Sequence, residues 1–404
     1  MLAVAEAQAR ILARIDHLAA EPCTLDDALG RYLAEPVVST ISVPPFANSA
    51  MDGFAIRSVD TLSESHLVEL RVAGAVQAGS LDPGSISQGE AARIMTGAPL
   101  PDGADAVIPF EETETREDVV VLPSGRKSGA CVRPAGLDIK PGDRVLEPSA
   151  RVGPRQIALA ASVGASRLMV RQRPVVAILA TGDELVEPGQ SLKPGQIYNS
   201  NAHGLVAAVR ELGAVPRLLA PARDDPDALR TIFRSLAGVD LILTSGGVSV
   251  GDYDFVKLVI GELGTVDFWR IRMRPGKPLM FGSLGAAGAP DGTTIMGLPG
   301  NPTSTMVTFF IFARPAILKL MGDPKPIPEP LLVVTDDDLD NRGGRETYFR
   351  VRLETRDGHL HAGLSGGQDS SMLLPLSRAN ALARVPAAIE HVAAGESVDV
   401  ITLT

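Results

Sequence analysis

Residues 241–254, LILTSGGVSVGDYD, constrain the fold more than any other stretch of this sequence. The stretch begins with a short, branched apolar run, passes through the glycine pair Gly246-Gly247 and ends with Asp252 and Asp254. This order predicts a buried strand, a glycine loop and the start of a helix. Because open α/β sheets bind ligands at the carboxyl ends of their strands, the loop is a candidate binding site.

The glycine loop suits an anionic ligand. Glycines allow backbone N–H groups to approach an anion, and the N-terminus of the following helix adds partial positive charge. The carboxylates of Asp252 and Asp254 come directly after the loop, and they would repel a phosphate unless a divalent cation lay between them. We therefore predict a magnesium-bridged phosphate. The alternative is a tight turn whose aspartates only cap the helix.

Strands and helices alternate around this stretch. The predicted strands are residues 173–180, 217–219 and 240–244, and the predicted helices are residues 202–212, 225–236 and 253–263. Such alternation implies right-handed βαβ crossovers and a parallel sheet. The first strand ends in Thr181-Gly182-Asp183-Glu184. Two strand ends thus carry glycine and acid, and we expect them to converge on one crevice.

Cationic residues gather further along the chain. Arg270, Arg272 and Arg274 alternate with apolar residues, which predicts three guanidinium groups on one face of a strand, and Lys277 follows. In a chain of net charge −10 this concentration favours an anion cradle; a solvated strand face is the alternative. The turn at residues 299–302 offers either a functional backbone shape or only the start of the next, apolar helix, in which Pro315 predicts a kink.

The rest of the chain predicts smaller units around the α/β part. An amphipathic helix opens the chain, short strands and turns follow, and a proline-rich linker precedes a small antiparallel barrel or sandwich. The predicted fold class is α/β plus β, and multidomain. Its parts are a linking domain of helical and extended segments at residues 1–42 and 138–172, an inserted β-rich domain at residues 43–137, a central α/β domain with a parallel sheet at residues 173–323, and a C-terminal β-barrel domain at residues 324–404.

Bulk properties exclude several classes of partner. The formal net charge of −10 argues against nucleic acid or an anionic membrane, because both need broad basic faces. Cys23 and Cys131 provide neither a disulfide framework nor a CxxC metal site. Charged residues interrupt the N-terminal apolar pattern, so it does not match a signal peptide. The longest apolar run, residues 306–313, is less than half of a membrane span of about 20 residues. We expect a soluble, cytoplasmic protein.

Other motifs narrow the chemistry. The sequence contains no GxxxxGK[ST] loop, and no GxGxxG follows a strand. Residues 247–251 match the GxSxG nucleophile elbow, so a serine hydrolase is an alternative, although the only later histidines lie in the predicted barrel. His359 and His361 form an HxH pair after a turn, and an exposed hairpin explains them better than a zinc site.

Six motifs, taken in order, resemble one known family. PPFANSAMDGFA, IMTGAPLPDGADAV, ATGDEL, TSGGVSVGDYD, RPGKP and GLPGNP resemble the molybdopterin molybdenumtransferase family, which includes MoeA and the E domain of gephyrin. The resemblance covers nearly the whole chain. It implies transfer of molybdenum from molybdate to adenylylated molybdopterin, with release of AMP and a requirement for Mg2+, and it implies a molybdopterin-binding role for the central α/β domain.

The resemblance also implies site residues. Asp183, Glu184 and Asp254 would hold the magnesium and the diphosphate and act in catalysis, with Asp224 or Asp225 nearby. Further residues implied to bind the substrates are Thr181, Gly182, Ser245, Gly246, Gly247, Ser249, Gly251, Arg274, Lys277, Pro299, Gly300, Asn301 and Pro302. From the barrel, Arg345, Arg350 and Ser370 match polar positions of the family.

The family forms an elongated homodimer in which the inserted β domain of one chain faces the crevice of the other. Asn48 and Ser49 would then bind substrate across the interface, and Asp52 and Thr96 would act in catalysis there. Ala47 stands where many members have Asp, so no catalytic carboxylate is assigned at that position. The implied partners are the small-molecule substrates, a second copy of the chain and, transiently, the adenylylating enzyme.

Two other functions remain open. The chain could be a scaffold that holds molybdopterin or a protein partner without turnover, as the E domain of gephyrin also anchors receptors. It could also be a nucleotide-pyrophosphate hydrolase that shares the α/β domain, like the competence-damage-protein relatives. The acids Asp183, Glu184 and Asp254 argue against a scaffold, since a scaffold needs no metal site.

Overall fold

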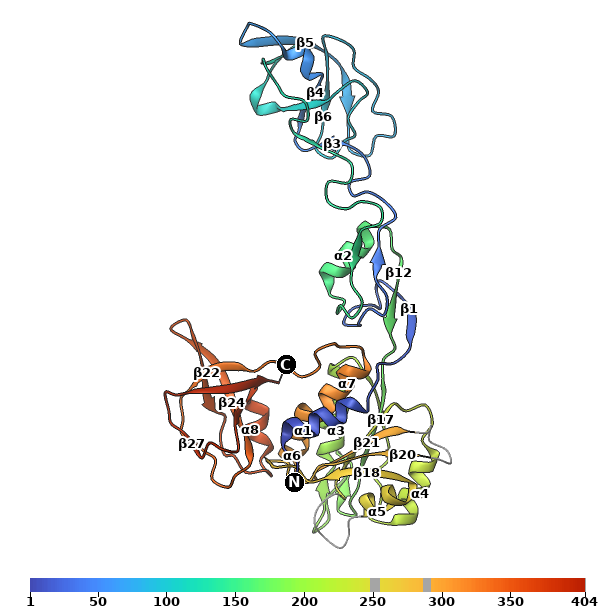
Figure 1. The fold of residues 1–404 in the computed structure, drawn as a ribbon, viewed down its shortest axis with the longest axis vertical. Coiled ribbons are helices and arrows are strands. Elements are labelled where there is room, and N and C mark those ends of the chain that lie inside the picture. The colour runs from blue at the N-terminus through green and yellow to red at the C-terminus, as the bar shows by residue number, and fades with distance from the viewer. Residues whose placement is uncertain (248–254, 286–291, 404) are drawn as a thin grey trace.

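The computed structural model describes residues 1–247, 255–285 and 292–403. The molecule is elongated, with a β-rich part at one end of its long axis and a broad base at the other (Figure 1). The base holds the central sheet and the C-terminal strands, and a narrow linking part that includes α2 (Pro154–Ser162) lies between the two ends.

The central sheet has six strands in the order β16-β13-β17-β21-β20-β18. The first four are parallel to one another. Strand β20 runs antiparallel to β21, and β18 runs antiparallel to β20. Their bounds are β16 Val215–Leu218, β13 Val175–Ala180, β17 Leu241–Ser245, β21 Thr293–Leu298, β20 Met280–Leu284 and β18 Gly264–Trp269. The predicted parallel α/β sheet is therefore confirmed, with an antiparallel edge of two strands that the sequence pattern did not predict.

Helices cover both faces of this sheet, which explains why its strands are apolar throughout. In β13, Val176 and Ile178 belong to one hydrophobic cluster, whereas Ala177 and Leu179 belong to another. Successive side chains of a strand point to opposite faces, so both faces are buried. The first cluster includes α1 (Val4–Ala13), α3 (Ser200–Glu211) and α6 (Pro302–Thr308), and the second includes α4 (Pro226–Ser235) and α5 (Phe255–Leu263).

The apolar helix after β21 is a core helix. Residues Pro302–Leu320 are long and apolar enough to cross a membrane by length and composition, but 72% of that window is buried inside the fold. The predicted kink at Pro315 takes the form of a π-helical segment, Phe309–Ala313, between α6 and α7 (Arg314–Leu320). Proline has no N–H and its ring crowds the carbonyl four residues before, and a π turn relieves this conflict.

The linking part is built by segments that are distant in sequence. Two antiparallel ladders, β1 (Ala20–Thr24) with β12 (Arg167–Arg171) and β2 (Val37–Val38) with β11 (Arg144–Leu146), join the outgoing and returning chain. The distal sheet has the order β7-β4-β6-β5-β9-β8, and β3 pairs with β10 beside it. The strands of this distal part are β3 Asn48–Ser49, β4 Gly53–Ile56, β5 Leu67–Val76, β6 Glu90–Ile94, β7 Ala106–Pro109, β8 Glu114–Arg116, β9 Val119–Pro123 and β10 Val132–Arg133. Two 3-10 turns lie at Ser58–Thr61 and Phe110–Glu112.

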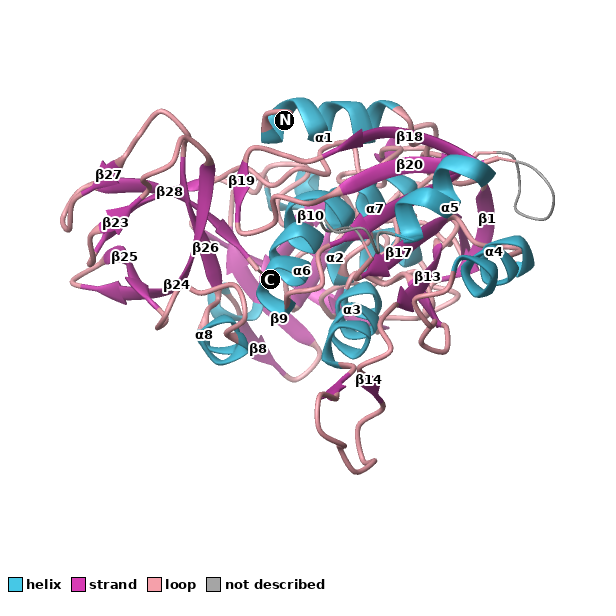
Figure 2. Ribbon diagram, turned by 90° about the horizontal axis from the view of Figure 1, so that it is seen from below, coloured by secondary structure: helices cyan, strands magenta, loops and turns pink. Residues whose placement is uncertain are grey.

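The C-terminal strands close into the predicted barrel, which has five strands, although β22 and β25 pair in parallel and not antiparallel as expected. Strand β24 pairs with both β25 and β26, and β22 and β28 complete the ring. Figure 2 shows this barrel beside the central domain. The elements are β22 Leu331–Thr335, β23 Leu339–Asp340, β24 Glu346–Arg356, β25 His359–Leu364, α8 Leu373–Arg378, β26 Ala381–Val385, β27 His391–Val392 and β28 Ser397–Thr402. The exact boundaries of the four domains stay a prediction.

The arginine-rich segment does not form the predicted strand with three guanidinium groups on one face. Only Met273–Arg274 is extended, as β19, and it pairs with β24 of the barrel. Arg270 has a φ of 98°, which breaks the alternation, and its guanidinium stacks on Trp269 with Cζ 4.1 Å from the ring centre. A residue at positive φ interrupts the extended backbone, so the alternation of a strand does not run from Arg270 to Arg274.

The central sheet should carry much of the stability of this domain. Replacing Leu243 of β17, which is fully buried, by Ala should lower the free energy of unfolding by about 2–5 kcal/mol, because it leaves a cavity. The same substitution at Leu258 of α5, which is 49% exposed, is the control. Urea denaturation of both variants checks this, and equal losses at the two positions would contradict the assigned core.

Candidate functional site

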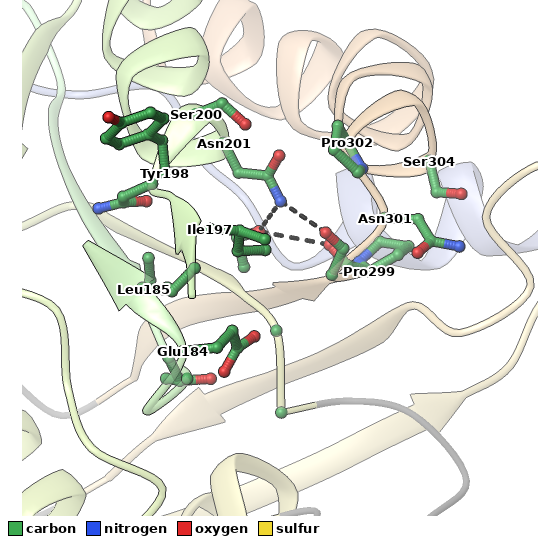
Figure 3. Close-up of a pocket in the computed structure, with 18 of the residues that line it drawn as sticks. Glu184, Leu185, Ile197, Tyr198, Ser200, Asn201, Pro299, Asn301, Pro302 and Ser304 are labelled. Carbon is green, nitrogen blue, oxygen red and sulfur yellow. Dashed lines mark hydrogen bonds between the residues drawn. The ribbon is translucent and has the colours of Figure 1, made fainter. Parts of the chain in front are cut away.

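A cavity of about 730 Å³ opens at the carboxyl ends of β13, β17 and β21 (Figure 3). Eleven of the residues predicted from the sequence line it: Thr181, Gly182, Glu184, Asp224, Ser245, Gly246, Gly247, Pro299, Gly300, Asn301 and Pro302. The sequence analysis missed the other lining residues, which are Ala180, Leu185, Ile197, Tyr198, Asn199, Ser200, Asn201, Pro278, Ser304 and Ser371. The predicted convergence of the first and third strand ends on one crevice is therefore confirmed for the described residues.

Parallel pairing holds the three loops of the cavity side by side. The N–H of Thr181 donates to the carbonyl of Ser245 at 3.0 Å, and the N–H of Gly246 donates to the carbonyl of Leu298 at 3.3 Å. The Ser245 hydroxyl donates to the carbonyl of Pro299 at 3.3 Å. Each strand end is thus hydrogen-bonded to the next, so the loops form one continuous floor.

Asn201 ties two of these loops to the first turn of α3. Its Nδ2 donates to Ser245 Oγ at 2.9 Å and to the carbonyl of Gly300 at 2.7 Å, as the dashed lines in Figure 3 show. The polar run Asn199-Ser200-Asn201 at the start of a predicted helix was a signal for this role, because Asn199 caps α3 and its neighbours face the strand ends.

The glycines of the floor are needed for close approach. A Cβ on Gly246, which has a φ of +94°, would lie 2.7 Å from the carbonyl oxygen of Thr181. A Cβ on Gly247, at φ +66°, would lie 2.5 Å from the side chain of Val256. Glycine alone tolerates both the contacts and the left-handed backbone. The floor therefore presents backbone without side chains, a surface that an anionic ligand can approach closely.

Acidic side chains gather at one side of the cavity. Glu184 and Asp224 line it, and Asp183 lies beside them. Burial raises the pKa of Asp224, and the negative charges of Glu184 and Asp183 raise it further. The same cluster is the predicted cation site, and a bound cation would relieve this crowding of like charges.

The magnesium centre stays a prediction. Among residues 1–247, 255–285 and 292–403, no group of three or more His, Cys, Asp or Glu side chains could hold a metal ion. The predicted ligand Asp254 lies outside the described residues, and so do Ser249 and Gly251 of the glycine loop. Asp225 does not line the cavity, because its carboxylate caps α4 by accepting hydrogen bonds from the N–H groups of Asp227 and Ala228.

A loop of the barrel forms the opposite wall. Ser371 lines the cavity, and Ser370 accepts a hydrogen bond of 2.9 Å from Nδ2 of Asn301. The N–H of Thr303 donates to the carbonyl of Ser370 at 3.2 Å. Arg274 and Lys277 are exposed and do not line the cavity, although Pro278, next to Lys277, does. The barrel and the segment before β20 thus meet at this wall.

Arg350 supports this wall from the face of β24 that points away from the barrel core, because its neighbours Phe349 and Val351 belong to that core. Its side chain is buried, and Nη2 donates to the carbonyls of Gly367 and Asp369 at 3.0 and 3.1 Å. Burial lowers the pKa of Arg350 to about 10. Arg350 therefore holds the loop that carries Ser370. Among the described residues that line the cavity, neither Arg345 nor Arg350 is present.

The four residues predicted to act across an interface form a second cluster. Asp52 accepts hydrogen bonds from the N–H and the hydroxyl of Thr96 at 2.6 and 2.7 Å, and these bonds lower the pKa of Asp52. Asn48 and Ser49 are buried in β3, and Asn48 Oδ1 has no partner among the described residues. Figure 1 places β3 near the far end of the molecule, so this cluster does not meet the cavity of its own chain.

Three family models match the chain in order. The MoeA N-terminal region (domain I and II) matches residues 2–164, the probable molybdopterin binding domain matches residues 177–319, and the MoeA C-terminal region (domain IV) matches residues 333–403. The molybdopterin molybdenumtransferase of Nostoc sp. is 39% identical over 383 residues, which cover 93% of this chain and 87% of that protein. The chain belongs to the molybdopterin molybdenumtransferase family.

Other members of the family agree in sequence and in fold. Molybdopterin molybdenumtransferase 2 of Mycobacterium tuberculosis is 38% identical over 94% of both chains. The crystal structure of a molybdopterin biosynthesis MoeA protein from Pyrococcus horikoshii has a TM-score of 0.85 at 31% identity, and it covers 100% of this chain and 99% of that one. The family and the multidomain fold class predicted from the sequence are therefore confirmed.

The crowding of carboxylates predicts coupled titration. Glu184→Gln removes one of the negative charges that raise the pKa of Asp224, so the pKa of Asp224 should fall. Because its pKa is raised by folding, the Asp224 carboxyl binds its proton more tightly in the folded chain than in the unfolded chain. Ionisation of Asp224 therefore costs stability as the pH rises through its folded pKa, and the substitution should reduce that loss. An NMR titration of the Asp224 carboxyl carbon checks the shift, with Glu211→Gln on the exposed side of α3 as control. An unchanged pKa would mean that the charge of Glu184 does not raise it.

Proposed function

We propose that this chain inserts molybdenum from molybdate into adenylylated molybdopterin, with release of AMP, in a reaction that depends on Mg2+. Its family makes it a molybdopterin molybdenumtransferase, an enzyme of molybdenum cofactor biosynthesis. The observation that carries the finer proposal is the meeting of a glycine floor and two carboxylates in one cavity at the strand ends.

The floor suits the diphosphate of an adenylylated substrate. Thr181, Gly182, Ser245, Gly246 and Gly247 line the cavity and bring backbone close to any ligand there. Diphosphate oxygens are well matched by backbone N–H groups. The turn at residues 299–302 and Asn201 fix the width of the cavity, and Ser249 and Gly251 belong to the same proposed cradle.

The acidic side suits magnesium. Mg2+ is bound by one or two carboxylates together with substrate phosphates, so the proposed ligands Asp183, Glu184 and Asp254 need no group of three acids among the described residues. When bound, the ion would neutralise charge on the diphosphate that is cleaved. Burial raises the pKa of Asp224, and the nearby carboxylates of Glu184 and Asp183 raise it further.

The barrel side suits molybdate, a small dianion. Arg274 and Lys277 are exposed next to the wall formed by the loop of Ser370, and their charges would favour an oxyanion there. Arg350 would act through the position of that loop. The dependence of AMP release on molybdate concentration in an Arg274→Ala variant measures this contribution.

We propose a homodimer in which the cluster of Asn48, Ser49, Asp52 and Thr96 of one copy faces the cavity of the other. The support is that this cluster is polar and preformed, yet lies far from the cavity of its own chain (Figure 1). A cytoplasmic location and transient contact with the adenylylating enzyme complete the proposal, since an adenylylated intermediate must be supplied by another enzyme.

Loss of one acid should abolish turnover. Purified chain with adenylylated molybdopterin, Mg2+ and molybdate should release AMP, and Glu184→Gln should slow this release by about 100-fold or more, because a metal-facing charge is lost with little change in volume. Glu211→Gln is the control, and circular dichroism checks folding. Near-normal AMP release by Glu184→Gln would refute the proposed metal site.

Mixing two inactive variants tests the shared site. Asp52→Asn and Glu184→Gln chains should each be inactive alone, whereas a mixture should recover about a quarter of the wild-type activity, since half of the dimers are mixed and each has one intact site. Sedimentation must show that mixed dimers form. Mixed dimers without recovered activity would place Asp52 outside the site.

A further inference from the structure

A two-stranded flap borders the cavity beyond the end of β13. Strands β14 (Leu185–Val186) and β15 (Ile197–Tyr198) pair in parallel, and residues 187–196 connect them. Figure 2 shows the flap projecting from the body of the molecule below α3. The flap begins directly after Glu184 and ends directly before the cap of α3, so both of its ends belong to the site.

The flap is held in a fixed position. The N–H of Ile197 donates to the carbonyl of Glu184 at 2.9 Å. Glu187 accepts a hydrogen bond from Nδ2 of Asn199 at 2.9 Å and contacts Nε2 of His203 at 2.9 Å, which ties the flap to α3. The hydroxyl of Tyr198 donates to the carbonyl of Gln190 at 3.0 Å. The orientation of the flap is therefore set before any ligand binds.

The flap turns apolar side chains toward the cavity. Leu185, Ile197 and Tyr198 line it, and Ile197 is 55% exposed. Leu185 pairs with Ile197, so these two side chains share one face of the flap, whereas Tyr198 alternates to the other face. In Figure 3 Leu185 and Ile197 lie on the side of the cavity away from Pro299 and Asn301, and the ring of Tyr198 points away from them. An exposed apolar surface inside a binding cavity indicates a ligand part that is itself apolar on one face.

We propose that Leu185 and Ile197 form an apolar platform that binds one face of a flat heteroaromatic ring of the substrate. This inference rests on the proposed function, whose substrate has two such rings, a pterin and an adenine. A flat ring has apolar faces and a polar edge, so it can cover the platform while the edge stays near polar groups. The hydroxyl of Ser200, which also lines the cavity beside Tyr198, is available to the edge.

The position of the platform beside the proposed diphosphate site favours a ring of the substrate as its ligand. Glu184 and Leu185 are consecutive, so the platform starts where the proposed diphosphate site ends. Each ring of the substrate is joined to the diphosphate by a short linker, and a ring can reach the flap while the diphosphate remains on the glycine floor. The platform would then strengthen the binding of a diphosphate that carries a ring, and diphosphate alone would bind more weakly.

Binding measurements on four variants test the platform. The ligands are AMP, molybdopterin and inorganic diphosphate, which has no ring, each titrated calorimetrically with Mg2+ present. Ile197→Ser and Leu185→Ala should raise the dissociation constant of at least one ring-bearing ligand by about tenfold and leave inorganic diphosphate unchanged, because only ring contact is lost. The ligand that responds identifies the ring.

Two control variants sharpen the test. Leu192→Ser makes the same kind of change as Ile197→Ser on the same flap, at a residue that is 44% exposed but does not line the cavity, and it should change nothing. Tyr198→Phe keeps the ring and should bind nearly as wild type does. Unchanged binding of both AMP and molybdopterin by Ile197→Ser and Leu185→Ala would overturn the platform. Failure of the wild-type chain to bind any of the three ligands would instead overturn the proposed function.

Discussion

The parallel pairing of β13, β17 and β21 is the constraint on which the site depends. It places Ala180 beside Ser245 and Ser245 beside Leu298, so three loops leave the sheet at one edge. Parallel strands require crossover helices, and these helices bury both faces of the sheet. The apolar strands and the position of the cavity thus have a single cause, and loops that are more than a hundred residues apart in sequence become neighbours.

Glycine and carboxylate act together at that edge. The backbones of the first and second loops approach so closely at Gly246 that no side chain fits between them. Carboxylates placed beside such a floor raise one another's cost of ionisation, as the pKa of Asp224 indicates. If the proposed function holds, a cation and an anion that enter together would offset each other's charge at this edge.

Periodicity predicted the parts of the structure that obey a local rule. The apolar strands, the helices between them and the rule that parallel strand ends meet at one edge were enough to place Thr181, Glu184 and Gly246 in one crevice. Asn201 could not be placed in this way, because its partners are 44 and 99 residues away. The alternation of Arg270, Arg272 and Arg274 looked like a strand, but a left-handed residue and pairing with the barrel override it. The flap has no period, and the roles of Asp52 and Thr96 came from family resemblance alone.

The length of the linking part has a consequence for how this protein would behave in dilute solution. A chain whose two polar clusters lie at opposite ends cannot bring them together by bending, because paired ladders hold the linking part on both of its strands. If the clusters serve one reaction, the specific rate per chain must decline on dilution below the dimer dissociation constant. The rate of product formation would then rise more steeply than in proportion to the concentration of the protein, without any separate effector.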